Sequence, residues 1–71
     1  MGFSQKIKTL RKAEGLSQAE LAKALNVNIG SVCGWERGNA PKYENMLLIA
    51  EYFKISLDEM FGQKDFFLLQ E

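Results

Sequence analysis

The amino-acid sequence predicts an all-α fold of five short helices. Apolar residues recur at the three- and four-residue spacing of helices, and no segment shows the alternating pattern of a half-buried strand. Two Ser-x-x-Glu sequences, Ser17 to Glu20 and Ser56 to Glu59, match the capping box that opens a helix. A length of 71 residues suits one small domain, so most large apolar side chains should be buried.

The first two helices are expected in the N-terminal part of the chain. The first covers about residues 3–14 and ends at Gly15, because glycine favours the left-handed conformation that follows a helix. The second begins after the N-cap Ser17 and closes near Asn26, with Leu16 placed to pack against its start. The residues expected to face the core share the helical repeat, and they are Phe3, Ile7, Leu10, Leu21, Ala22 and Leu25.

The third helix should start after the N-cap Asn28 and stop before Gly38. A short turn that contains the only proline leads to the fourth helix, over about residues 43–53. Lys42 stands at the capping position of that helix, so its start is weakly specified. The residues available for the core from these two helices are Val32, Trp35, Met46, Leu47, Ile49, Ala50 and Phe53.

The fifth helix should open at the second capping box and end at Gly62, with Leu57, Met60 and Phe61 in it. We therefore assign residues 1–62 to the helical domain and residues 63–71 to a short apolar tail. The tail is expected to pack back onto the domain, to form a dimer contact or to bind another protein. Its apolar residues are consecutive, which suits neither a one-faced helix nor a half-exposed strand, and they are Phe66, Phe67, Leu68 and Leu69.

Composition argues against several classes of protein. The chain has no histidine, and this removes the commonest general base of enzymes. Its single cysteine allows no internal disulfide and no zinc site, and fits a reducing compartment. No apolar run approaches the roughly 20 residues of a membrane span. We expect a protein that is not an enzyme, needs no metal, cofactor or small-molecule substrate, and works in the cytoplasm.

The formal net charge is zero, which is unusual for a protein that binds DNA by itself. The charges are unevenly distributed, since residues 1–42 hold seven basic and three acidic residues, whereas residues 43–71 hold two basic and six acidic ones. The N-terminal half is thus suited to an anion such as DNA or an acidic protein surface, and the C-terminal half is not. A solvated surface of mixed charge is the alternative interpretation.

The chain resembles the Cro/CI-type helix-turn-helix family of phage and bacterial regulators, also called the XRE family, over about residues 3–62. The resemblance rests on three motifs in the family's order and nearly at its spacing: Leu16-Ser17-Gln18-Ala19-Glu20-Leu21-Ala22, Trp35-Glu36-Arg37-Gly38 and Ser56-Leu57-Asp58-Glu59. It implies a lambda-repressor-like domain whose second and third helices form the helix-turn-helix. The turn after Gly38 is about one residue shorter than the family pattern.

The resemblance also implies roles for particular residues. Arg11 and Glu36 correspond to an internal salt bridge between the first and third helices. Ile29, Gly30 and Gly34 occupy positions whose side chains usually read base edges in the major groove. The residues expected at DNA phosphates, helped at Gln18 by the start of its helix, are Gln18, Asn28, Ser31, Arg37 and Lys42.

The three reading positions carry little that can discriminate bases. Discrimination needs donors and acceptors such as those of Arg, Gln or Asn, and each good pair contributes about 1–3 kcal/mol. Ile29 can touch a thymine methyl, and the two glycines have no side chain. One interpretation is drift at unselected surface positions. The other is a flat face that lets a partner approach the backbone closely.

Other departures point toward a protein partner. Leu48 stands where the family usually has a solvated lysine, and Cys33 replaces a polar residue beside Gly34. A scattered surface leucine and a small helix residue are the plain alternatives. The candidate protein interface combines these positions with the flat face and the tail, and its residues are Ile29, Gly30, Cys33, Gly34, Leu48, Phe66, Phe67, Leu68 and Leu69.

We therefore predict a phage-type transcriptional regulator of a lysis–lysogeny switch in a bacterial host cell. It is expected to act as an anti-repressor that binds its cognate repressor, with weak or low-specificity binding to double-stranded DNA. The alternative is a Cro-like repressor that binds its operator as a homodimer. The antitoxin of a toxin–antitoxin pair is a third reading, weakened by the short tail.

Overall fold

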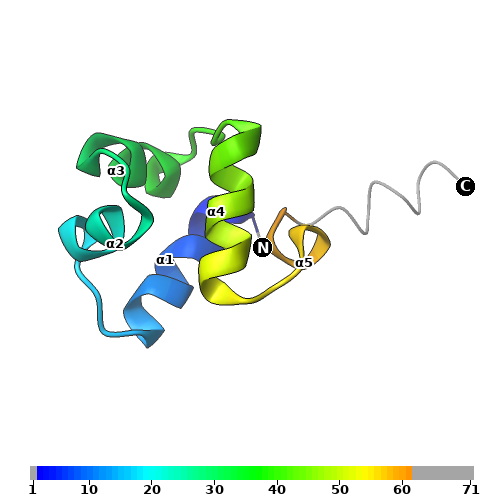
Figure 1. The fold of residues 1–71 in the computed structure, drawn as a ribbon, viewed down its shortest axis with the longest axis horizontal. Coiled ribbons are helices and arrows are strands. Elements are labelled where there is room, and N and C mark those ends of the chain that lie inside the picture. The colour runs from blue at the N-terminus through cyan, green and yellow to red at the C-terminus, as the bar shows by residue number, and fades with distance from the viewer. Residues whose placement is uncertain (1, 62–71) are drawn as a thin grey trace, which may run out of the picture.

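The computed structural model describes residues 2–61, and within this range it contains five α-helices and no strand (Figure 1). In order these are α1 (Phe3–Ala13), α2 (Gln18–Leu25), α3 (Ile29–Arg37), α4 (Tyr43–Phe53) and α5 (Leu57–Phe61). The predicted all-α fold is confirmed, with every described helix boundary within about one residue of the expectation. The predicted tail, Phe66 to Leu69 included, lies outside the described residues.

The helix starts explain why the boundaries were predictable. Ser17 Oγ accepts a hydrogen bond from the Glu20 backbone N–H at 3.1 Å, and Glu20 Oε1 accepts one from the Ser17 N–H at 2.7 Å. The same reciprocal pair opens α5, where Ser56 Oγ accepts from the Glu59 N–H at 3.1 Å. Each capping box satisfies backbone donors that the helix itself leaves without partners.

The start of α4 has no such cap. Lys42 occupies the N-cap position and makes no capping hydrogen bond with its side chain. At the other end, Lys54 takes the left-handed conformation with φ of 57°, which an ordinary side chain adopts at some energetic cost. α4 is therefore held by packing rather than by its ends.

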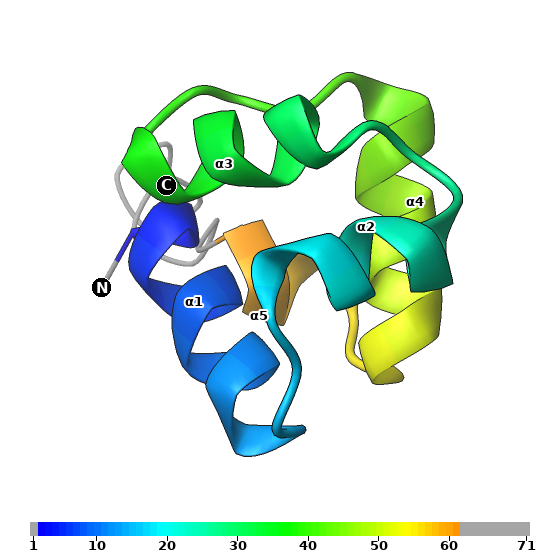
Figure 2. The ribbon, with the colours of Figure 1, turned by 90° about the vertical axis from the view of Figure 1, so that its left-hand side faces the viewer.

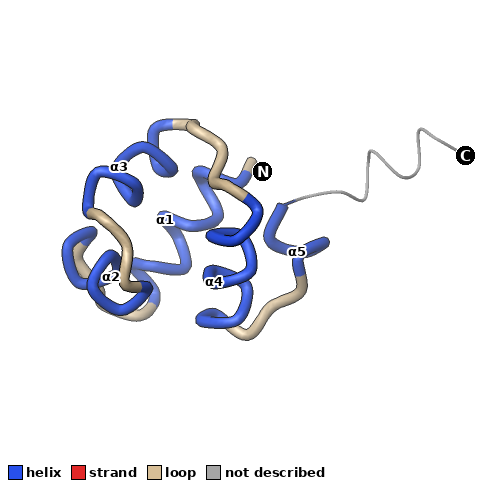
Figure 3. The backbone as a smooth tube through the Cα atoms, turned by 45° about the horizontal axis from the view of Figure 1, so that its top comes forward, coloured by secondary structure: helices blue, strands red, loops and turns tan. Residues whose placement is uncertain are grey.

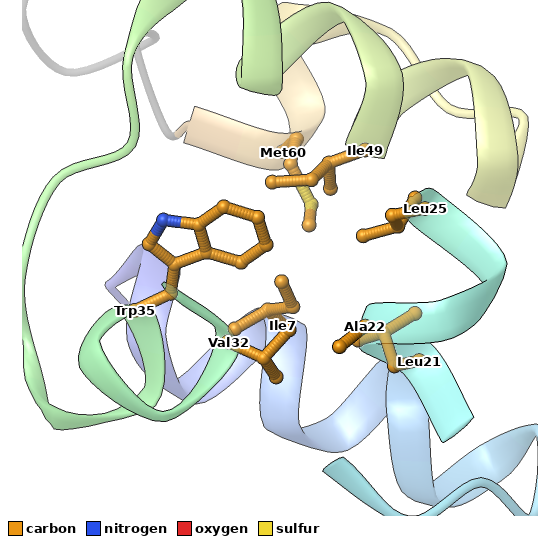
Figure 4. Packing of buried hydrophobic residues seen from close by; sticks show 8 residues of the cluster. All are labelled: Ile7, Leu21, Ala22, Leu25, Val32, Trp35, Ile49 and Met60. Atoms are coloured by element: carbon orange, nitrogen blue, oxygen red, sulfur yellow. The ribbon is translucent and has the colours of Figure 1, made fainter. Parts of the chain in front are cut away.

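The core fills the space between all five helices (Figure 4). Trp35 from α3 lies beside Ile7 of α1, while Ile49 of α4 and Met60 of α5 close the core from the opposite side. The buried cluster consists of Ile7, Leu21, Ala22, Leu25, Val32, Trp35, Ile49 and Met60. One expected core residue is misplaced, since Leu47 is 44% exposed on the outer face of α4.

Packing between helices sets the shape of the domain. α3 contacts α1 and α2, whereas α4 packs against α2 and α5. After a turn of 90° from Figure 1, α1 and α4 stand at opposite edges with α3 across one end (Figure 2). The backbone tube shows short connections between the helices (Figure 3). None of the described helices is long and apolar enough to cross a membrane.

Candidate nucleic-acid interface

α2 and α3 form a helix-turn-helix, with a three-residue connection between them. Asn26 ends α2 in the left-handed conformation, with φ of 60°, and the Val27 N–H then donates to the Ala22 carbonyl at 2.9 Å. Asn28 starts α3 by accepting a hydrogen bond from the Gly30 N–H on its Oδ1, at 2.8 Å. This turn fixes the direction in which α3 leaves α2.

The reading face is the surface of α3 predicted to read bases, formed by Ile29, Gly30 and Gly34. Its first turn, with Ile29 and Gly30, is the part exposed to solvent. Ile29 is 47% exposed, and Asn28 and Gly30 beside it are exposed as well. A Cβ on Gly30 would meet one atom within 4 Å, Asn28 Oδ1 at 3.3 Å. Gly30 thus leaves the capping oxygen of Asn28 uncrowded, and Ile29 is the apolar side chain that this turn presents.

Gly34 does not share that open face, which corrects our expectation. It is buried, and a Cβ built on it would lie 3.0 Å from Asn39 Nδ2 and 3.8 Å from the Asn39 Cβ. The Asn39 N–H also donates to the Gly34 carbonyl at 2.9 Å, after the left-handed Gly38 with φ of 117°. Asn39 folds back over the end of α3, and its side chain lies where a Cβ on residue 34 would point. Glycine at this position therefore allows the close approach of Asn39.

Gln18, expected at a phosphate, is half-buried, and its side-chain amide bonds to two neighbouring side chains. Its Nε2 donates to Glu36 Oε1 at 3.0 Å, and its Oε1 accepts a hydrogen bond from Cys33 Sγ at 3.2 Å. A phosphate at the start of α2 would compete with both bonds for this side chain. Cys33 was assigned to a protein interface, yet its thiol helps to hold α2 on α3.

The salt bridge implied by the family resemblance is present between α1 and α3. Arg11 Nε donates to Glu36 Oε2 at 2.6 Å, and a second guanidinium nitrogen donates to Glu36 Oε1 at 3.1 Å. A third donates to the Leu16 carbonyl at 2.7 Å. The pair is shielded from solvent, since the side chain of Arg11 is 11% exposed and that of Glu36 is 3% exposed.

The surroundings of Glu36 favour its charged form. Burial by itself would raise the pKa of this carboxyl, but the hydrogen bonds from Arg11 and Gln18 and the charges of Arg11 and Lys8 outweigh it. The pKa of Glu36 is therefore lowered from its ordinary value of 4.5. The pKa of Arg11 is raised, chiefly by its hydrogen bond with Glu36.

The remaining candidates for phosphate contacts lie along α3 and just beyond it. Ser31 is half-buried in the first turn, Arg37 is exposed in the last turn, and Lys42 is exposed before α4. An α-helix rises about 1.5 Å per residue, so Asn28 and Arg37 are separated by about 14 Å along α3. The structure therefore brings Asn28, Ile29, Gly30 and Ser31 together and places Arg37 and Lys42 apart from them.

The outer face of α4 carries exposed apolar residues that the sequence analysis missed. Leu48 was predicted there and is 40% exposed, but Tyr43, Leu47 and Tyr52 are exposed beside it at 67%, 44% and 38%. A helical projection of residues 43–53 indicates that these residues face outward, because only part of an apolar helix can face a small core.

The described residues contain no group of acidic, cysteine or histidine side chains arranged to hold a metal ion.

Comparison with known proteins agrees with this fold and motif. Residues 7–60 match a helix-turn-helix family model, so the chain belongs to the Cro/CI-type, or XRE, helix-turn-helix family. The match includes the capping boxes, the turn between α2 and α3, and the Arg11–Glu36 pair.

Two curated relatives are transcription regulators. The chain is 31% identical over 72 aligned residues to the HTH-type transcriptional activator BcrR of Enterococcus faecalis, covering all of this chain and 35% of that protein. It is also 31% identical over 64 residues to the cryptic phage CTXphi transcriptional repressor RstR of Vibrio cholerae, covering 89% of this chain and 57% of the relative. The chain therefore spans between about a third and three fifths of these relatives.

A solved structure supports the fold assignment. The crystal structure of a transcriptional regulator from Listeria innocua superimposes with a TM-score of 0.77 at 33% sequence identity. The superposition covers 84% of this chain and 57% of the other chain. The chain thus shares its fold with this structure and belongs to the XRE helix-turn-helix family.

Proposed function

We propose that this regulator acts as an anti-repressor in a phage-type genetic switch, in the cytoplasm of a bacterial host. It binds a cognate repressor protein and has weak, low-specificity affinity for DNA. The observation that carries the proposal is that the exposed part of the reading face has no side chain able to discriminate bases by hydrogen bonds. The exposed first turn of α3 offers Ile29 and a glycine, while the Gln18 amide is bonded to Glu36 and Cys33.

The proposed DNA contacts are mostly to phosphates. Arg37 and Lys42 are exposed cations, and Asn28 and Ser31 lie at the start of α3, where backbone N–H groups favour an anion. Phosphate contacts position a protein without reading sequence. Binding of this kind weakens steeply with salt, with a slope of about −0.9 in log K against log[salt] for each phosphate neutralised.

A Cro-like repressor that acts directly on an operator as a homodimer is the second candidate. The intact helix-turn-helix favours it, as does the similarity to a phage protein named as a transcriptional repressor. It differs from the first candidate in needing sequence discrimination from the α3 surface, where each good base contact contributes about 1–3 kcal/mol.

Competition between specific and nonspecific DNA separates the two candidates. The anti-repressor should bind its own promoter region less than about tenfold more tightly than scrambled DNA of equal length, because it lacks base-reading side chains. A preference of about a thousandfold or more would instead support the Cro-like repressor, since this is where specific DNA binders begin.

A further inference from the structure

The outer face of α4 combines apolar and acidic side chains in a definite order. Tyr43 and Leu47 are four residues apart and form one row, and Leu48 and Tyr52 form a second. At 3.6 residues per turn, Glu44 and Glu51 project between these two rows. All six residues are exposed. We call this surface, made of Tyr43, Glu44, Leu47, Leu48, Glu51 and Tyr52, the α4 face.

The α4 face is directed away from the rest of the domain. The opposite side of the helix carries Ile49 and Ala50 into the core. α4 stands at the edge of the domain farthest from α1, with its packing against α2 and α5 on the inner side (Figure 2). Tyr52 is held by an edge-to-face contact with Phe53, with 5.1 Å between ring centroids. Such support reduces the side-chain freedom lost when a partner binds.

We propose that the α4 face is the docking site for a protein partner whose contact surface is basic as well as apolar. Tyrosines are enriched at protein interfaces, and a row of apolar side chains on each side can cover apolar groups of the partner. The two carboxylates between the rows have no ion-pair partner within residues 2–61, and burying them without one is costly. The partner must therefore supply arginine or lysine side chains.

The same charges argue against a second copy of this chain as the occupant. Two α4 faces brought together by a twofold axis would place the Glu44–Glu51 stripes against each other, and like charges in a desolvated contact are repulsive. DNA is excluded as the occupant of the α4 face because its phosphates carry the same negative charge as Glu44 and Glu51. The DNA-binding surface of a repressor has the required chemistry, since it must be basic to meet phosphates. This inference rests on the proposed anti-repressor function and deepens it.

The test measures binding of this protein to the full-length repressor of the proposed switch, by isothermal titration calorimetry. Leu48→Lys should weaken binding by about tenfold or more, which corresponds to a loss of about 1.4 kcal/mol. The double change Glu44→Gln and Glu51→Gln preserves side-chain shape and should both weaken binding and reduce its dependence on salt. Ala24→Lys, which adds the same charge on an exposed site of α2, is the matched control and should leave binding within about twofold.

Circular dichroism of each variant verifies that the domain is folded. If the repressor binds and Leu48→Lys behaves like Ala24→Lys, the α4 face is not the docking site, and the anti-repressor function stands. If the wild-type protein shows no binding to the repressor at concentrations up to about 100 μM, both the proposed function and this inference are wrong. A dimer in sedimentation equilibrium that Leu48→Lys dissociates would make a second copy the occupant and would overturn the inference.

Discussion

At the scale of single residues, Glu36 links the stability of the domain to pH. Its pKa is lowered in the folded state by Arg11 and Gln18, so the unfolded chain takes up a proton at higher pH than the folded chain does. The stabilisation is thus fully present above the ordinary value of 4.5 and is lost as pH falls through the lower folded pKa.

The variant Glu36→Gln tests this linkage. It should lower the free energy of unfolding at pH 7 by about 2 kcal/mol, because it removes the charge partner of a shielded arginine. The loss relative to wild type should shrink as the pH falls from about 5 to 3. Urea unfolding at several pH values measures both effects. A constant difference across this range would show that ionised Glu36 is not the source of the acid sensitivity.

Gly34 gives a second test at residue scale, through its contact with Asn39. Alanine is favoured over glycine inside a helix by about 1 kcal/mol, but here its Cβ would press on Asn39 Nδ2 at 3.0 Å. Gly34→Ala should therefore change stability little in the wild-type chain and stabilise the Asn39→Ala variant by about 1 kcal/mol. A double-mutant cycle of unfolding free energies measures the coupling between residues 34 and 39. If Gly34→Ala had the same effect in the wild-type chain and in the Asn39→Ala variant, contact with Asn39 would not explain the glycine.

These residues also mark where sequence reasoning failed at this scale. Gly34 was expected on an open face from its position in the family pattern, but Asn39 of the loop after α3 lies against it. The phosphate contact of Gln18 stays a prediction, and the bonds of its amide to Glu36 and Cys33 depend on residues distant in the sequence. The Arg11–Glu36 pair was foreseen because the resemblance, rather than any spacing rule, connects residues 25 positions apart.

At the scale of helices, the ends were predicted correctly and one face was misassigned. Capping boxes at Ser17 and Ser56 and the glycine after α3 are local signals, and the helices begin and end at them. Leu47 was expected in the core because it lies in a run of five apolar residues, 46–50, and only the angular positions around the whole helix show which of them face inward. The inner side of α4 is set by its packing on α2 and α5.

The uncapped start of α4 leads to a prediction. Lys42→Ser should raise the free energy of unfolding by about 1 kcal/mol, because serine can accept a hydrogen bond from the first turn of the helix. Lys42→Ala removes the same charge without adding a cap and is the control. Thermal unfolding distinguishes the two variants. Equal unfolding midpoints for Lys42→Ser and Lys42→Ala would show that the serine does not cap the helix.

At the scale of the whole protein, the uneven charge distribution is consistent with the two binding activities that we propose. Arg37 and Lys42 are exposed near the helix-turn-helix, while Glu44 and Glu51 are exposed on the outer face of α4. Two phosphate contacts by these cations predict a slope of about −2 in log K against log[salt] for DNA binding by one protein molecule. Lys42→Ala should reduce that slope by about one, as measured by fluorescence anisotropy. An unchanged slope would remove Lys42 from the interface.

Under the proposed function, this chain controls a repressor rather than an operator. A footprint of the switch's repressor on its own operator, titrated with this protein, tests this proposal. We expect the footprint to be lost or altered at concentrations at which this protein alone protects no specific site. An unaffected repressor footprint, together with specific protection by this protein alone, would contradict the claim and identify a Cro-like repressor.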